Sequence, residues 1–406
     1  MKVLSFISGI FLFANFSLFC ADGRVLLQGF HWNSVRSSKP WWNIIYENSS
    51  EIKRGQFDLV WLPPSNDSLS DEGYLPRKLY IQDSKYGTED ALKSAISKLH
   101  SYGIKVVADI VINHRVGVTD WADFRDPDWK LDACVKDDEY KKCEGNYDTG
   151  KGYDAARDID HTQKYVRDSI KQWMLWLKNS IGYDGWRYDY ARGFSSQYIL
   201  EYTEATNPSF SVAEIWDDLD LNNTDKHRQA LCNWMDSVKG KIKVFDFTTK
   251  GILQYVIQTG EYWRLVDKNG RPSGLLGWWP DNAVTFIENH DTQNRTSGSG
   301  HRSWPFPSNR ILEGYAYILT HPGIPTVFWP HFFDYGFKEE IIKMISIRKK
   351  YGINSASSVY IIAATNGLYV ARIDDKLIVK MGSSDYSPDS SYKLLTSGYN
   401  YAIWGR

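Results

Sequence analysis

Two acidic side chains in this sequence are placed where they could attack and protonate a substrate. Asp189 follows residues 183–188, which are predicted to form a short strand, and Arg187 precedes it by two positions. Residues two apart share one face of a strand, so these two side chains should point the same way. The guanidinium would keep the carboxylate ionised and lower its pKa, as a nucleophile in sugar transfer requires. A structural Arg–Asp pair explains this segment equally well.

The second acidic side chain is Glu214, which follows the apolar residues 210–213 and precedes Trp216. Apolar surroundings favour the neutral acid, so the pKa of Glu214 should be raised, as suits a proton donor. If residues 183–188 and 210–213 form neighbouring strands, they lie about 4.8 Å apart. The two carboxyl groups could then approach the roughly 5–5.5 Å separation of a retaining glycosidase.

Two more apolar segments end in polar groups that could bind a sugar. Residues 104–112 are followed by Asn113 and His114, and residues 283–287 are followed within four positions by His290 and Asp291. We expect Asp291 to hold sugar hydroxyls, with the two histidines as hydrogen-bond donors. A single histidine after a strand is more often structural, but several such groups at one end of a fold favour a functional site.

Eight short, mostly apolar segments predict the strands that would position these groups. They are residues 24–30, 57–62, 104–112, 183–188, 210–213, 243–247, 283–287 and 325–328. Helical patterns lie between them, at residues 41–52, 89–102, 164–179 and 196–205. The alternation predicts an α/β fold, a (β/α)8 TIM barrel over residues 22–350, whose chemistry would lie at the carboxyl ends of the strands.

Two regions depart from this alternation. Residues 115–160 are long, polar and rich in Asp and Gly, and they predict a small subdomain inserted after the third strand. Residues 351–406 contain short alternating segments with turns at Asn366-Gly367 and Asp374-Asp375. This pattern predicts a C-terminal antiparallel β-sheet domain.

The composition narrows the class of ligand. The chain has 406 residues and a formal net charge of -1, which argues against nucleic acid or an anionic membrane as the main partner. Aromatic residues make up 15% of the chain, including 17 Trp. Aromatic rings stack on the apolar faces of sugars, so a carbohydrate ligand is indicated, although a Trp-rich core would give the same composition.

The N-terminus predicts export. Residues 1–21 contain a lysine followed by an apolar stretch too short to span a membrane, as in a secretory signal peptide. An oxidising compartment would permit one disulfide, most simply Cys134–Cys143, and would leave Cys232 as a buried free thiol. N-glycosylation sequons begin at Asn48, Asn66, Asn222 and Asn294.

Four segments of the chain resemble the signature regions of the α-amylase family of glycoside hydrolases. They are Asp-Ile-Val-Ile-Asn-His at 109–114, Gly-Trp-Arg-Tyr-Asp at 185–189, Val-Ala-Glu at 212–214 and Phe-Ile-Glu-Asn-His-Asp at 286–291. Other segments, such as 28–32, 245–251 and 277–280, look like the plant-type subfamily. The resemblance implies that Asp189 is the nucleophile, Glu214 the acid/base and Asp291 the transition-state stabiliser, supported by Arg187, His114 and His290.

The same resemblance implies further binding residues. Tyr74 is similar to the ring that stacks on the sugar being cleaved, and Trp278-Trp279 resembles a surface starch-binding pair, although ordinary exposed aromatics are the alternative. The family has a structural calcium ion between barrel and insertion. Its oxygen ligands would here be Asn113, Asp148, Asp158 and the carbonyl groups of Lys151 and Gly193. From the residues alone, Asp148 and Asp158 are solvated loop charges.

We therefore expect a secreted α-amylase that hydrolyses internal α-1,4 bonds of starch- or glycogen-type glucans with retention, as a monomer with one Ca2+. An exo-acting α-glucosidase or an α-glucan transglycosylase of the same family is the alternative. A non-catalytic glycan-binding relative is disfavoured because no catalytic carboxylate is lost. The chain departs from the family pattern at Tyr188, Tyr190 and residues 329–331, which could alter packing, pH response or specificity.

Overall fold

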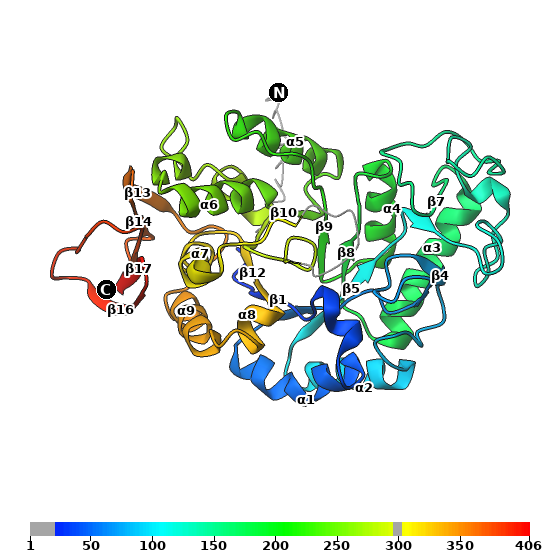
Figure 1. Cartoon of the computed structure of the whole chain (residues 1–406), viewed down its shortest axis with the longest axis horizontal. Helices are drawn as coiled ribbons and strands as arrows, with labels where there is room; N and C mark the ends of the chain where they lie inside the picture. The colour runs from blue at the N-terminus through cyan, green and yellow to red at the C-terminus, as the bar shows by residue number, and fades with distance from the viewer. Residues whose placement is uncertain (1–20, 295–302) are drawn as a thin grey trace, which may run out of the picture.

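Eight parallel strands close into a barrel at the centre of the molecule (Figure 1). The structure is a computed structural model that describes residues 21–294 and 303–406, so the predicted signal peptide lies outside the described residues except for Ala21. In barrel order the strands are β1 (Leu26–Gln28), β12 (Ile324–Phe328), β11 (Ala283–Thr285), β10 (Lys243–Phe245), β9 (Phe210–Ala213), β8 (Gly185–Tyr188), β5 (Lys105–Ile110) and β2 (Leu59–Trp61). The predicted (β/α)8 barrel is confirmed.

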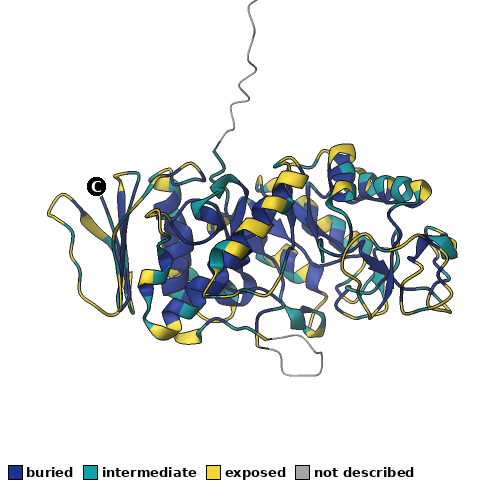
Figure 2. Cartoon of the chain, turned by 90° about the horizontal axis from the view of Figure 1, so that it is seen from above, coloured by how far each residue is buried: buried dark blue, intermediate teal, exposed yellow. Residues whose placement is uncertain are grey.

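Helices surround the barrel and turn their apolar sides inward. They are α1 (Trp41–Arg54), α2 (Glu89–Ser101), α3 (Lys164–Trp176), α4 (Ser196–Thr206), α5 (Thr224–Ser237), α6 (Phe247–Thr259), α7 (Ile311–Thr320), α8 (Trp329–Phe333) and α9 (Lys338–Lys350). Figure 2 shows their exposed residues on the outer side and buried residues against the barrel. Because the barrel strands are covered in this way, the residues of β8 and β9 are all buried, and apolar side chains fill most positions.

Local capping explains where two elements differ from the predicted bounds. The strand predicted for residues 243–247 stops at Phe245, because the Asp246 carboxylate accepts the Thr249 N–H and so caps α6. The helix predicted for residues 164–179 continues after α3 as a π-helical turn, Leu177–Ile181. It ends at Gly182, which has φ 108°, a conformation that favours glycine.

The insertion after β5 is tied to the barrel at both of its ends. Strand β6 (His114–Arg115) pairs antiparallel with β7 (Arg157–Asp158), so the region leaves and re-enters the barrel at one place. Cys134 and Cys143 form the predicted disulfide inside it, and Cys232 is buried as a free thiol. A second small hairpin, β3 (Asp67–Ser68) with β4 (Pro76–Lys78), follows β2 and was not predicted.

The C-terminal residues form the predicted antiparallel sheet. Its strands are β13 (Val359–Thr365), β14 (Leu368–Ile373), β15 (Leu377–Met381), β16 (Lys393–Gly398) and β17 (Tyr401–Gly405), in the order β13-β14-β15-β17-β16. Gly367, Asp374 and Asp375 adopt positive φ in the two predicted turns. The sheet packs against α7 and α9, at the opposite end of the molecule from the insertion (Figure 1).

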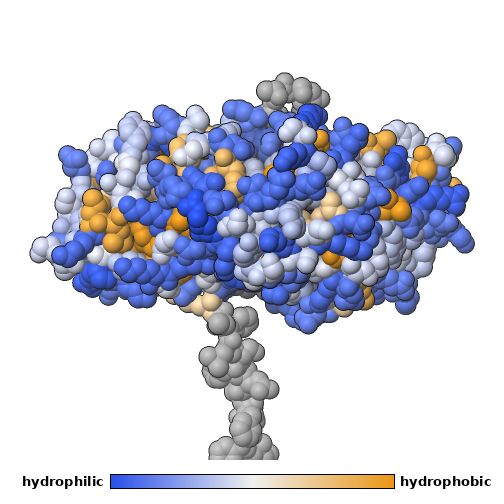
Figure 3. Space-filling model, turned by 90° about the horizontal axis from the view of Figure 1, so that it is seen from below, coloured by the Kyte–Doolittle hydropathy of each residue, from blue (hydrophilic) through white to orange (hydrophobic). Residues whose placement is uncertain are grey.

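The surface is predominantly hydrophilic on the face shown in Figure 3, where apolar residues form separate small groups. No helix in residues 21–294 or 303–406 combines the length and the apolar character that a membrane crossing requires. Of the sequon asparagines, Asn222 is exposed, whereas Asn66 is buried and its amide donates to the Asp67 carbonyl. Asn66 is therefore a poor glycan acceptor in the folded chain.

Candidate active site

The buried guanidinium of Arg187 contacts both predicted carboxylates at the carboxyl ends of β8 and β9. Arg187 Nη1 donates to Asp189 Oδ1 over 2.6 Å, and Arg187 Nη2 lies 2.9 Å from Glu214 Oε1. The second contact is an ion pair without hydrogen-bond alignment, because Nη2 has no acceptor in line. The predicted common orientation of Arg187 and Asp189 is confirmed, and Glu214 joins them.

Strand register explains why these groups meet. Tyr188 on β8 is paired with Ala213 on β9, and Asp189 and Glu214 are the next residues of the two strands. The Glu214 N–H donates to the Tyr188 carbonyl and the Ala191 N–H to the Glu214 carbonyl, so the main chains stay in register beyond the strand ends. The two carboxyl groups therefore come from adjacent positions of one sheet edge, as expected.

Asp109 is a site residue to which the sequence analysis assigned no role. It lies on β5 opposite Arg187, whose Nη1 it binds at 2.8 Å. Its other carboxylate oxygen accepts the Tyr74 hydroxyl at 2.9 Å and the Trp61 indole N–H at 3.1 Å. Asp109 thus fixes both Arg187 and Tyr74. The available signal was a carboxylate inside the almost wholly apolar residues 104–112.

The carboxylates of this cluster are harder to ionise than ordinary ones. Burial raises the pKa of Asp189 to about 7, although the Arg187 guanidinium opposes the rise. Burial likewise raises the pKa of Asp109 to about 7 and that of Glu214 above its usual value. The prediction for Glu214 is confirmed, whereas the predicted lowering for Asp189 is wrong. One guanidinium cannot offset the burial of three carboxylates, so the cluster holds protons near neutral pH.

Asp291 and His290 belong to the same site. The His290 Nε2 atom is 3.2 Å from Asp291 Oδ2, and its Nδ1 atom is 3.0 Å from the side-chain amide nitrogen of Gln28. An amide nitrogen only donates, so Nδ1 accepts and the ring proton lies on Nε2, facing Asp291. Both residues follow β11 (Ala283–Thr285), as the sequence predicts.

Parallel aromatic rings form one wall of the site. The Tyr74 ring stacks on His290 with centroids 5.2 Å apart, and Trp32 stacks on Tyr74 at 6.1 Å. His114 donates from Nε2 to the Tyr74 carbonyl at 2.8 Å, and burial lowers the pKa of His114 to about 4. A neutral His114 therefore also holds Tyr74 in place. Trp32 lies in residues 28–32, which resemble the plant-type subfamily, but the sequence analysis assigned it no role.

These side chains line a cleft of about 600 Å3. The lining brings together the predicted residues Tyr74, His114, Lys151, Asp189, Glu214, His290 and Asp291. It also includes residues that the sequence analysis did not assign, Trp32, Tyr153, Arg192, Trp216, Asp217 and Asp218 among them. Trp216 stacks on Phe247 with centroids 5.1 Å apart and is thereby fixed in the wall.

Trp278 and Trp279 are not part of this cleft. Both are half-buried and pack against the core. The Arg228 guanidinium lies 3.6 Å from the centroid of the Trp278 ring, and the Trp278 indole N–H donates to Asp267 at 3.3 Å. Their role as a surface starch-binding pair stays a prediction, and one face of Trp278 is already covered.

The predicted calcium ligands converge where the insertion meets the barrel. The Asn113 amide donates to Asp158 Oδ1 at 3.0 Å, and Gly193 lies so close that an added Cβ would stand 1.9 Å from Asn113 Oδ1. Gly150, two residues after Asp148, packs directly on the Gly193 main chain, and the Lys151 N–H donates to the Arg192 carbonyl. The five predicted ligand residues therefore come from three segments that meet in space.

Several oxygen atoms at this place suit a hard cation. Asn113 Oδ1 and Asp148 Oδ2 are buried without a hydrogen-bond partner. Burial raises the pKa of Asp158 to about 8, and the neighbouring carboxylates of Asp148 and Asp138 add to the rise. No cluster of three His, Cys, Asp or Glu side chains suited to a metal occurs in the described part of the chain, so amide and main-chain oxygens would have to complete the shell. Such a donor set fits Ca2+.

Comparisons with known proteins identify the family. A family model described as the α-amylase catalytic domain matches residues 45–245, and one described as the α-amylase C-terminal β-sheet domain matches residues 350–405. The chain is 42% identical to "Probable alpha-amylase 2" of Arabidopsis thaliana, and the alignment covers 94% of both chains. The chain belongs to the α-amylase family. It is accordingly a glycoside hydrolase, and the similarity to plant enzymes is confirmed.

One further relative and two solved structures are also similar to this chain. "Alpha-amylase 3, chloroplastic" of A. thaliana is 40% identical over 94% of this chain and 44% of its own length. The structure of an α-amylase from Geobacillus thermoleovorans complexed with acarbose superposes with a TM-score of 0.64 at 17% identity, covering 88% of this chain and 86% of that one. The structure of "Gamma-CGTASE" from alkalophilic Bacillus clarkii superposes with a TM-score of 0.70 at 16% identity, covering 95% of this chain and 70% of that one. These low identities establish the fold alone.

Proposed function

We propose that this α-amylase family enzyme hydrolyses internal α-1,4 bonds of starch- or glycogen-type glucans by a retaining double displacement. The observation that carries the proposal is the contact of one buried guanidinium with both Asp189 and Glu214, at 2.6 and 2.9 Å. Two carboxyl groups that contact one guanidinium lie close together. This fits the roughly 5–5.5 Å separation of the carboxyl groups in retaining enzymes better than the roughly 6.5–9.5 Å separation in inverting ones.

The contacts of Arg187 also support the division of roles. Its aligned hydrogen bond goes to Asp189 and favours the charged form there, whereas its contact with Glu214 lacks that alignment. The contacts of Arg187 therefore favour the proton of the pair on Glu214, although the Tyr190 N–H also donates to Glu214 Oε2 at 3.2 Å. In the first step Asp189 attacks the anomeric carbon while Glu214 protonates the leaving glucosidic oxygen, and the glucosidic C–O bond breaks.

The second step releases the sugar from the enzyme. Ionised Glu214 takes a proton from water, the water oxygen attacks the anomeric carbon, and the bond to Asp189 breaks. Both carboxyl groups return to their starting states. Asp291, beside the His290 Nε2–H, would hold sugar hydroxyls in the transition state, and Tyr74 would stack on the sugar ring. Two inversions at one carbon give net retention.

The products released early from amylose test this proposal. We expect a mixture of oligosaccharides of many lengths, separated by anion-exchange chromatography, because internal bonds are cut without preference for an end. The new reducing ends should appear first as the α-anomer in an NMR time course, because the mechanism retains configuration. A single short product would instead establish an exo-acting enzyme, and products longer than the substrate a transglycosylase. Initial release of the β-anomer would contradict the double displacement.

We further propose that one Ca2+ joins the insertion to the barrel, held by Asn113, Asp148, Asp158 and the carbonyl groups of Lys151 and Gly193. The buried Asn113 and Asp148 oxygens without hydrogen-bond partners support this site. When bound, the ion would supply the positive charge that two buried carboxylates otherwise lack, and it would hold the segments beside Tyr190 and Glu214. Its role would be structural.

Removal of calcium is expected to lower the melting temperature. At a free Ca2+ concentration 1,000-fold above Kd, binding stabilises the folded state by about 4 kcal/mol, and a chelator removes this contribution. Scanning calorimetry with and without chelator measures the shift. In Asp158→Asn the shift should be much smaller, whereas the exposed neighbour Asp154→Asn should behave like the wild type. An unchanged melting temperature after chelation, with no metal in elemental analysis, would exclude the site.

We also propose that the enzyme is secreted and acts as a monomer. The predicted signal peptide at residues 1–21 supports export, and the Cys134–Cys143 disulfide suits an oxidising compartment. The carboxylates, Arg187, Tyr74 and the aromatic wall all come from one chain, so the proposed chemistry needs no second copy.

A further inference from the structure

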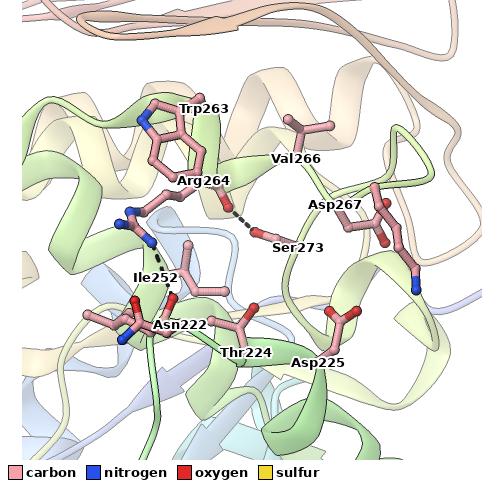
Figure 4. A pocket seen from close by; sticks show the side chains of 11 residues that line it. Asn222, Thr224, Asp225, Ile252, Trp263, Arg264, Val266, Asp267 and Ser273 are labelled. Atoms are coloured by element: carbon pink, nitrogen blue, oxygen red, sulfur yellow. Dashed lines mark hydrogen bonds between the residues drawn. The ribbon is translucent and has the colours of Figure 1, made fainter.

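A second pocket, of about 380 Å3, lies outside the catalytic cleft and shares no lining residue with it. It is formed between the start of α5, the middle of α6 and the 3-10 turn Tyr262–Leu265. Figure 4 shows Trp263 and Val266 on one side and Asn222, Thr224 and Asp225 on the other, with Ile252 between them. The pocket therefore offers an indole ring facing a row of polar side chains.

Trp263 is one of two exposed tryptophans among the described residues, with 46% of its surface exposed. The Arg264 guanidinium lies 4.4 Å from the centroid of its ring, and Arg264 is fixed in turn by Glu261 Oε2 at 2.6 Å and the Leu221 carbonyl at 3.2 Å. An exposed indole supported by an anchored guanidinium is a rigid surface, so a ligand that stacks on it loses little side-chain entropy of the protein.

The polar groups around Trp263 suit an uncharged ligand with many hydroxyls. The Asp225 and Asp267 carboxylates both bind Arg228 Nη2, each at 2.8 Å, so one guanidinium offsets part of their negative charge. Neutral hydroxyl groups come from Thr224 and Ser273, and Lys268 adds a cation. Mixed donors and acceptors beside an aromatic face match the alternating hydroxyls and apolar faces of a sugar, whereas a strongly anionic ligand would meet two carboxylates.

The loop after β9 connects this pocket to the catalytic cleft. Glu214, Trp216, Asp217 and Asp218 line the cleft, and Leu221, Asn222, Thr224 and Asp225 line the pocket. Asp218 and Leu221 are three residues apart, so their Cα atoms are separated by at most about 11 Å. A polymer bound in the cleft could therefore extend along this loop to the pocket that contains Trp263.

We propose that this pocket is a second glucan-binding site, in which Trp263 stacks on a glucose unit of the polymer while another part of the substrate occupies the cleft. The ligand class rests on the proposed function, but the pocket geometry does not. Binding at two sites on one chain raises the effective concentration of substrate at the cleft, so the gain should appear with long or insoluble glucans and not with short ones.

Retention on starch granules tests the proposal independently of catalysis. The parent protein carries Glu214→Gln, which prevents degradation of the granules, and it is produced without N-glycans because Asn222 at the rim begins a sequon. Adding Trp263→Ala should weaken retention about tenfold, equivalent to about 1.4 kcal/mol. Trp263→Phe should restore most of it, because a smaller aromatic ring still stacks.

Trp121→Ala is the matched control, because Trp121 is 47% exposed and lies in the insertion, away from this pocket. It should leave retention unchanged. With the catalytic residues intact, Trp263→Ala should also lower the ratio of granule hydrolysis to hydrolysis of a maltoheptaoside. The proposal is overturned if Trp263→Ala retains the parent affinity, if Trp121→Ala loses as much, or if both rates fall in proportion. Failure of the wild type to cut soluble starch would refute the proposed function but not the binding result.

Discussion

Asp189→Asn is expected to lower kcat on soluble starch by about four orders of magnitude, the scale of loss when one member of a catalytic group is removed. The amide cannot form the covalent intermediate, although it preserves the shape of the side chain and one acceptor for Arg187. KM should change little, because Tyr74, Trp32 and the rest of the cleft remain in place. Initial rates from reducing-end assays, with folding verified by circular dichroism, measure the effect.

Glu214→Gln separates the two roles within the same experiment. It should lower kcat on starch by about 10²–10⁴, the usual contribution of general acid–base catalysis. With a maltosyl fluoride, whose leaving group needs no proton, Glu214→Gln should form the covalent intermediate at a substantial rate, whereas Asp189→Asn should remain inactive. If both variants respond equally to the fluoride, the assigned roles are wrong.

Asp184→Asn is the matched control, because Asp184 stands just before β8 and Asp189 just after it. Its carboxylate accepts from the Val106 N–H at 2.8 Å and binds His100 and Lys105, at the end of the strand away from the cleft. Asp184→Asn should reduce stability but leave kcat unchanged. A large loss of kcat in this variant would show that damage to β8, and not removal of the nucleophile, accounts for the Asp189 result.

The barrel could be predicted because its strands are buried on both faces. Such strands appear as short apolar segments bounded by turns, so all eight were found within a few residues of their true ends. The exceptions follow local capping, as at Asp246, which the segment pattern does not reveal. The hairpin β3–β4 was missed because its two short strands are polar and mostly half-buried, so no apolar segment marks them in the sequence.

The site could be predicted in its composition but not in its electrostatics. Asp189, Glu214 and Asp291 follow strands, and the carboxyl ends of strands meet at one face of a barrel. The direction of the Asp189 pKa was wrong because it depends on burial and on the charges of Glu214 and Asp291, which raise it. Asp109 also binds the same Arg187 nitrogen as Asp189. Strand register brings Asp109 opposite Arg187, and a sequence segment does not show which residue of another strand it will face.

The same cluster makes Arg187 important for stability. Its side chain is fully buried and is the only cation in contact with Asp109, Asp189 and Glu214 among the described residues. Arg187→Met keeps most of the volume and removes the charge, which leaves three carboxylates facing one another in a buried site. We expect a loss of about 3–5 kcal/mol at pH 8, as for other buried ion pairs that lose one partner.

This loss should shrink at pH 5, because protonation removes the repulsion. Burial raises the pKa values of Asp109 and Asp189 to about 7 in the wild type, so the stability linked to their neutral forms is full below pH 3.8 and lost as the pH rises through 7. Without Arg187 these pKa values rise further, so the variant loses more than the wild type over that range. Melting temperatures at pH 5 and pH 8 measure the difference.

Arg348→Met provides the comparison that isolates the electrostatic part. Arg348 is also fully buried, but it donates to the main-chain carbonyls of Leu319, His321 and Gly323 at 2.7–3.2 Å. Its replacement should destabilise the fold about equally at both pH values, because its hydrogen-bond partners are carbonyl groups that do not titrate, and Asp22 and Asp58 act on it only through their charge. If Arg187→Met shows the same pH-independent loss, Arg187 acts through packing alone. In that case Arg187 would not determine which carboxyl group attacks and which one donates the proton, and another charged group would have to do so.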